Sequence, residues 1–300
     1  MISKMRSMIY YSAIDALKVC VIGNDLFSHL KTEDEFNFDG GCVKVNERMS
    51  TPSGETKEIF GRVLLDGLDY LFAELQLSSD KYSWITICDR SFYDVLTNVD
   101  GDKISMVATL ETLLPALGLS MLHVTRVDVC CDVNVSATAR VKKAIRDTQG
   151  LAMIVNGRRV PDDAPSIGYF YQANRFRLMG QPTIYLKSTG GLALKVYDKG
   201  RELEQAASYK NSFIRQWSGI TGETMHRVEI TIRGNRIDKF CQANGITQEE
   251  FLEGLLHHEF RMAVLEELID DVLRFNPVPM ANRKQANKVS VIDVVLGRYK

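Results

Sequence analysis

The sequence lacks any apolar run near the roughly 20 residues that a membrane-spanning helix needs. Its first eleven residues contain no apolar stretch followed by a small-residue cleavage site, so we expect a cytoplasmic protein with no membrane contact. None of the six cysteines forms a CxxC pair, which argues against a structural zinc site or a disulfide framework. Internal repeats and low-complexity tracts are also missing. What remains is a globular chain of 300 residues, of which 45% are hydrophobic.

The chain also lacks a large net charge of either sign, because its 37 Lys and Arg residues and 38 Asp and Glu residues leave a formal net charge of -1. This balance excludes a protein that coats DNA with an evenly basic surface. The charge is nevertheless uneven along the chain: residues 1–139 carry 12 basic and 20 acidic side chains, residues 140–240 carry 18 and 9, and residues 241–300 carry 7 and 9. The basic middle block is suited to DNA phosphates if it also clusters in space, and the alternative is an ordinary solvated surface.

Hydrophobic periodicity predicts a mixture of helices and strands. Strands are expected at residues 12–22, 84–88, 122–134, 169–179, 182–187, 192–198 and 227–233. Helices are expected at residues 58–77, 104–117 and 137–147, and a long helix is expected from a Thr247 cap to about Phe275. Short loops such as residues 188–191 join neighbouring strands as hairpins. We therefore expect the α+β class, with a mostly antiparallel central sheet, helices on one face and the other face partly open.

The predicted strand 122–134 carries carboxylates on a polar face. Alternation places Arg126, Asp128 and Asp132 on one side and valines on the other. Two carboxylates four residues apart on a strand are about 13 Å apart. Both would need acids from neighbouring strands to complete a metal site.

The predicted strand 227–233 repeats this design. Glu229 lies at mid-strand, on the same face as Arg227 and Arg233. One interpretation is that each acid forms an ion pair with an arginine on a neighbouring strand. The other is an oxygen-rich site for a hard cation such as Mg²⁺ or Mn²⁺, which two such strands favour.

The predicted hairpin before that strand places tyrosines among lysines. Tyr185 and Lys187 share a face of its first strand, and Lys195, Tyr197 and Lys199 share a face of its second. A neighbouring cation favours the phenolate form of a tyrosine, which is the form that attacks phosphorus. Ordinary strand aromatics are far more common than nucleophilic tyrosines, so the hairpin alone leaves both interpretations open.

The order of these motifs resembles the replication initiation factor family. The motifs are Arg126–Asp132, Tyr185–Ser188, Leu194–Glu202, Arg227–Ile230 and Arg233. This family includes rolling-circle initiators of small plasmids, filamentous-phage replication proteins and related conjugative relaxases, of the type without a His-hydrophobe-His pair. The resemblance covers about residues 120–240, and residues 195–202 are its most specific part.

The resemblance implies a site-specific, metal-dependent DNA nickase that initiates rolling-circle replication. In such enzymes a tyrosine attacks one strand at the origin, retains the 5′ phosphate as a phosphotyrosine and leaves a 3′ hydroxyl that primes synthesis. By position in the motifs, Tyr185 matches the nucleophile, with Tyr197 as the alternative. Asp128, Asp132 and Glu229 match ligands of Mg²⁺ or Mn²⁺, with Asp198 and Glu202 as weaker candidates. The DNA contacts would come from Arg126, Lys187, Lys195, Lys199, Arg227 and Arg233.

The charge distribution and the predicted elements suggest an organisation, and the resemblance suggests partners. We expect an acidic N-terminal α/β region at residues 1–118, a catalytic core with the basic block at 119–245, and a C-terminal helix and tail at 246–300. The expected partner is origin DNA, supercoiled or single-stranded at the nick site, and a host helicase and a homodimer stay open. The turn after Lys187 lacks two basic residues that the family usually carries there and that would contact the scissile strand.

Three alternatives to a replication initiator stay open at this point. A conjugative relaxase of the same family would use the same chemistry. A sequence-specific DNA-binding regulator could keep the fold without catalysis. A tyrosine recombinase would need a helical domain with an Arg/His/Arg set before a late tyrosine such as Tyr299, and the strand-rich middle of the chain disfavours it.

Overall fold

The computed structural model describes residues 8–79, 82–94, 106–147, 151–160, 183–188, 190–205, 210–222, 224–277 and 288–299. The strands are β1 (Tyr10–Ile22), β2 (Glu35–Phe38), β3 (Gly41–Ser50), β4 (Thr56–Leu65), β5 (Ala73–Ser78), β6 (Ser83–Ile87), β7 (Ser120–Val133), β8 (Leu151–Val155), β9 (Arg158–Arg159), β10 (Ile184–Lys187), β11 (Leu192–Asp198), β12 (His226–Arg233), β13 (Leu273–Pro277) and β14 (Val289–Ser290). The helices are α1 (Asp25–Leu30), α2 (Asp89–Asp94), α3 (Met106–Ala116), α4 (Ala137–Arg146), α6 (Lys199–Gln205), α7 (Lys210–Ser218), α8 (Gly234–Asn244), α9 (Gln248–Gly254), α10 (His258–Val272) and α11 (Val291–Leu296).

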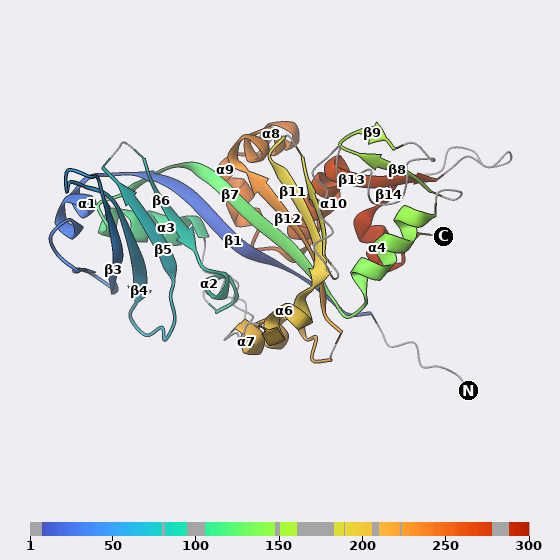
Figure 1. The fold of residues 1–300 in the computed structure, drawn as a ribbon, viewed down its shortest axis with the longest axis horizontal. Helices are drawn as coiled ribbons and strands as arrows, with labels where there is room; N and C mark the ends of the chain where they lie inside the picture. Colours follow the sequence, from blue (N-terminus) through green and yellow to red (C-terminus); the bar gives the residue numbers. More distant parts are fainter. Residues whose placement is uncertain are drawn as a thin grey trace. The chain divides into compact units, whose positions relative to one another are not determined.

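A ten-stranded sheet dominates the fold, in the order β10-β11-β12-β7-β1-β6-β5-β4-β3-β2 (Figure 1). The pairs β10–β11, β11–β12 and β1–β6 are antiparallel, as are the four pairs from β6 to β2. A second, four-stranded sheet has the order β14-β13-β8-β9. The predicted α+β class with a mostly antiparallel sheet is therefore confirmed.

The chain divides into two compact units, and neither is a continuous stretch. One unit contains residues 1–13, 129–232 and 258–300, and the other contains residues 14–128 and 233–257. The three consecutive regions expected from the sequence stay a prediction. Among the described residues, none of the helices is long and apolar enough to cross a membrane.

The predicted helix over residues 58–77 was wrong, because this segment forms β4, a turn and β5. Ile59, Gly61 and Val63 are buried at every second position, which is the period of a strand. Gly67 adopts a positive φ of 81° in the turn, a conformation that favours glycine. Several leucines and valines of this segment also fit the spacing of a helix, and a helix was predicted for that reason.

The predicted long helix after Thr247 is two helices followed by a strand. Thr247 caps α9 as expected: its side chain accepts a hydrogen bond from the Glu250 backbone, and the Glu250 side chain accepts one from the Thr247 backbone. Helix α9 ends at Gly254, and the next helix, α10, begins at His258. From Leu273 onward it is extended as β13, because it pairs with β8 and β14. The predicted strand at residues 169–179 lies outside the described residues.

The three strands β10, β11 and β12 have one apolar and one polar face. The apolar face consists of side chains exposed by 2% or less, namely Ile184, Leu186, Leu194, Val196, Val228 and Ile230. Helix α4 packs on this face, since Thr138 of α4 lies within hydrogen-bond distance of His226, which points to the same side of β12 as Val228. The opposite face presents the polar side chains that the sequence analysis singled out.

We predict that truncating a side chain of the buried apolar face lowers the free energy of unfolding more than truncating an exposed one. Leu194→Ala removes buried methyl groups from the apolar face and should lower the free energy of unfolding by about 2–5 kcal/mol. The matched control is Leu122→Ala, where the side chain is 47% exposed, and a change within about 0.5 kcal/mol is expected. Urea denaturation measures both. Equal costs would contradict the assignment of the buried face.

Candidate active site

Three candidate residues form a row across neighbouring strands. Tyr185 on β10 lies directly opposite Lys195 on β11, and Lys195 lies directly opposite Glu229 on β12. Directly opposite residues of antiparallel strands have Cβ atoms about 4.5–5.5 Å apart, so each is a neighbour of the next. Tyr185 is half-buried, and Lys187, two residues further along β10, is exposed. The polar face of the hairpin therefore presents a phenol and two lysines together.

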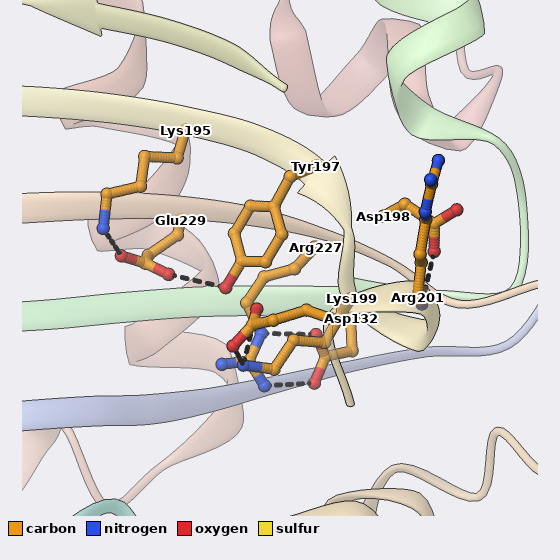
Figure 2. A network of polar contacts seen from close by, with 9 residues as sticks. Asp132, Lys195, Tyr197, Asp198, Lys199, Arg201, Arg227 and Glu229 are labelled. Atoms are coloured by element: carbon orange, nitrogen blue, oxygen red, sulfur yellow. Dashed lines mark hydrogen bonds and ion pairs between the residues drawn. The ribbon is translucent and has the colours of Figure 1, made fainter. Parts of the chain in front are cut away.

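Glu229 is buried and is held by two partners from β11. The Lys195 ammonium lies 2.6 Å from Oε1 of Glu229, and the Tyr197 hydroxyl donates to Oε2 at 3.0 Å (Figure 2). The side chain of Glu229 is only 2% exposed, whereas that of Lys195 is 34% exposed. Burying a carboxylate is costly unless it is paired and hydrogen-bonded, and Lys195 and Tyr197 provide both here. Lys195 thus links a buried acid to the accessible side of the sheet.

Asp132 on β7 and Arg227 on β12 form a second pair. The Arg227 guanidinium donates from Nε and from a terminal nitrogen to the two Asp132 oxygens, at 2.7 and 2.8 Å (Figure 2). Both side chains are 0% exposed. A metal ion or a DNA phosphate would reach either group only after this two-point pair had opened. The predicted roles of Asp132 as a ligand and Arg227 as a phosphate contact stay predictions.

Asp128, four residues before Asp132 on β7, is paired in the same manner. Arg126 donates through Nε to Oδ1 at 2.9 Å and through a terminal nitrogen to Oδ2. The Asp128 side chain is 3% exposed and that of Arg126 is 43% exposed. The polar face predicted for this strand therefore carries a pair between residues two positions apart.

The segment after Tyr197 turns from strand into helix. Asp198 accepts a hydrogen bond from the Arg201 backbone at 2.9 Å, which is the geometry of an N-cap for α6. The Lys199 ammonium donates to both Glu202 oxygens at 3.1 Å and lies 5.7 Å from the centre of the Tyr197 ring. Lys199 is buried and Glu202 is half-exposed. Three of the candidates, Asp198, Lys199 and Glu202, thus fix the end of β11 in the described structure.

Tyr11 on β1 is a third tyrosine close to this network. Burial raises the pKa of Tyr11, nearby Arg261 lowers it, and Cys130 and Asp132 raise it further. The net pKa is above the usual value, so Tyr11 stays a phenol and is poorly suited to attack phosphorus. The buried His226 has a pKa lowered by burial, which Asp198 partly offsets. Neither residue was singled out from the sequence, because both depend on neighbours distant in the chain.

The carboxylates do not fit a divalent cation in this arrangement. Both oxygens of Asp128, Asp132 and Glu229 already accept hydrogen bonds from arginine, lysine or tyrosine side chains. Hard cations need such oxygens as ligands. Across the part of the chain that the structure describes, three or more His, Cys, Asp or Glu side chains are nowhere grouped as a metal site. A divalent cation could bind these carboxylates only after at least one of the pairs had opened.

The role of Tyr197 as the partner of Glu229 was not predicted from the sequence. Tyr197 was expected as an alternative nucleophile, and the structure places its hydroxyl 3.0 Å from an oxygen of the buried Glu229 carboxylate. The alternation of side chains does place Lys195 and Tyr197 on the polar face of one predicted strand and Glu229 on the polar face of the next strand. The register that brings them together requires knowing where the two strands pair.

No protein-family model matches the chain, and no curated protein matches it. Among solved structures, the chain is similar to a rolling circle replication initiator protein from Geobacillus stearothermophilus, with a TM-score of 0.47 and 12% sequence identity. The match covers 96% of this chain and 95% of that one.

We predict that Asp132 and Arg227 contribute to the free energy of unfolding as a pair, so that removing one partner costs more than removing both. Arg227→Met leaves a buried, unpaired carboxylate and should cost about 3–5 kcal/mol in the free energy of unfolding. The double variant Arg227→Met/Asp132→Leu should recover most of that loss, because no charge is left buried. Urea denaturation of the single and double variants measures the difference. A double variant as unstable as the single one would contradict the pairing.

Proposed function

We propose that the protein is a site-specific DNA nickase and strand transferase that initiates rolling-circle replication, with Tyr185 as the nucleophile. The observation that carries the proposal is the row Tyr185–Lys195–Glu229 across β10, β11 and β12. It provides a half-buried phenol, a partly exposed lysine on the neighbouring strand and a buried acid that pairs with the lysine ammonium. The motif order of the sequence points to the same activity.

The proposed step is a transesterification at one phosphodiester. The Tyr185 oxygen forms a bond to phosphorus while the bond from phosphorus to the 3′ oxygen breaks. The phenol gives its proton to water, and the departing 3′ oxygen takes one from water, so the step consumes no water. The products are a 5′-phosphotyrosine and a free 3′ hydroxyl. Rejoining is the reverse reaction, in which a 3′ hydroxyl displaces the tyrosine.

Lysines on the same face would bind the scissile strand. Lys187 is exposed and Lys195 is 34% exposed, so both are accessible to a phosphate. An ammonium group at this position stabilises the negative charge that gathers on the phosphate oxygens during attack. Arg233, exposed at the end of β12, is a further phosphate contact on this proposal.

A non-catalytic DNA-binding regulator is the second candidate. It is favoured by the pairing of Asp128, Asp132 and Glu229 with cationic or hydroxyl partners, which leaves no metal site among the described residues. Such a protein would bind DNA without forming a covalent adduct. A conjugative relaxase would share the proposed chemistry and differ only in its biological use.

We predict that Tyr185→Phe abolishes covalent attachment to DNA. The probe is random-sequence single-stranded DNA with a 3′ fluorophore, because the proposed adduct retains the 3′ part of the cut strand. The wild-type protein should give a fluorescent band on a denaturing gel, and sequencing of the captured DNA gives the preferred site. Tyr10→Phe is the matched control, since Tyr10 is 42% exposed and lies outside the row.

The outcomes separate the two candidates. Loss of the band in Tyr185→Phe with nearly unchanged DNA binding supports the nickase. A persistent band in Tyr185→Phe would place the nucleophile elsewhere. No band with the wild-type protein, together with tight DNA binding, would favour the regulator.

The metal requirement is a separate prediction that rests on the motif resemblance. Adduct formation should depend on added Mg²⁺ or Mn²⁺ and stop in EDTA, which would require at least one of the three pairs to open when DNA binds. Isothermal titration of Mn²⁺ with and without the captured oligonucleotide measures this directly. Full activity in EDTA would remove Asp128, Asp132 and Glu229 from a metal role and leave them as structural pairs.

A further inference from the structure

We propose that Tyr197 is a positioning residue, which acts through Glu229 to hold the side chain of Lys195, the cross-strand neighbour of Tyr185. This inference rests on the proposed function and assigns a role within the same site. Tyr197 was expected as an alternative nucleophile, and the hydrogen bond from its hydroxyl to Glu229 favours a positioning role instead.

The geometry connects four residues in one chain of contacts. The Tyr197 hydroxyl donates to one oxygen of Glu229 at 3.0 Å, and the Lys195 ammonium lies 2.6 Å from the other oxygen (Figure 2). Lys195 in turn is the cross-strand neighbour of Tyr185. Glu229 is thus fixed from two sides, and its second contact determines where the lysine stands.

The Tyr197 ring is itself held in place. Lys199 is buried, its ammonium lies 5.7 Å from the ring centre, and it is anchored by both oxygens of Glu202. A cation near the face of an aromatic ring is attracted to it, and the effect is larger when the cation is removed from water. On the opposite strand, Arg227 is directly opposite Tyr197 and is locked to Asp132. The hydroxyl therefore points to Glu229 with little freedom.

The same contacts make Tyr197 a poor nucleophile. If its phenol lost the proton, a phenolate would stand 3.0 Å from the buried Glu229 carboxylate, and two like charges at that distance oppose each other. What distinguishes Tyr197 is this contact of its hydroxyl with a buried carboxylate, since both tyrosines have a basic residue as cross-strand partner. The hydrogen bond to Glu229 therefore suits Tyr197 to positioning rather than to attack.

The first experiment measures single-turnover adduct formation with the oligonucleotide recovered from wild-type adducts. Tyr197→Phe should slow the reaction about ten- to a hundredfold, the effect of one lost hydrogen bond to a charged group, with the affinity for DNA nearly unchanged. Glu229→Gln should slow it as well. In the Glu229→Gln background, Tyr197→Phe should have little further effect, because both act through the same lysine. Tyr10→Phe controls for the loss of a phenolic hydroxyl elsewhere.

Three results of that experiment would overturn the inference. An unchanged rate in Tyr197→Phe would remove its positioning role. Fully additive effects of the two substitutions would show that Tyr197 does not act through Glu229. Loss of the adduct in Tyr197→Phe together with its persistence in Tyr185→Phe would make Tyr197 the nucleophile.

The second experiment tests the positioning without any reaction. In protein labelled with ¹⁵N at the lysine side chains, the Lys195 ammonium signal is identified by its absence in Lys195→Arg. It should be observable in the wild-type protein and broaden in Tyr197→Phe, while Tyr10→Phe leaves it unchanged. An unaltered signal in Tyr197→Phe would contradict the inference. A wild-type protein that forms no adduct would refute the proposed function alone, and this signal would still decide the role of Tyr197.

Discussion

The antiparallel register of β10, β11 and β12 is the constraint on which the candidate site depends. It aligns Tyr185, Lys195 and Glu229 in one row and places Tyr197 opposite Arg227 in the next. Because side chains alternate along a strand, a slip of one residue would turn Lys195 and Tyr197 of β11 into the core and expose Leu194 and Val196 instead. The burial of those apolar side chains against the rest of the unit therefore holds the polar face in place.

The acids of the polar face are used to neutralise buried or half-buried cations. Asp132 pairs with Arg227, Glu229 with Lys195 and Asp128 with Arg126. The surplus of basic residues in the middle of the sequence is thus partly offset inside the fold, and the exposed Lys187 and Arg233 are among those on the surface. The positive charge on the surface therefore depends on which basic side chains are paired, rather than on the residue count. This is why near-neutrality of the whole chain says little about DNA binding.

Much of the fold was predictable from the sequence because alternation is a local signal. The strands β1, β7, β10, β11 and β12, the helices α3 and α4 and the cap at Thr247 lie close to their predicted positions. The segment 58–77 was mispredicted because its apolar residues satisfy two periods, and β13 was missed because its pairing with β8 involves residues more than 100 positions away. The Asp132–Arg227 pair joins residues 95 positions apart and could not be derived without the sheet order.

The identity of the covalently modified residue tests the central claim most directly. DNA trapped on the wild-type protein is trimmed with nuclease, and the protein is then digested with trypsin, which cuts after lysine and arginine. Tyr185 falls in the peptide of residues 178–187, and Tyr197 falls in the separate peptide of residues 196–199. Mass spectrometry should find a 5′-phosphorylated nucleotide on residues 178–187, with the bond at Tyr185. A nucleotide on residues 196–199, or on any other peptide, would contradict the account.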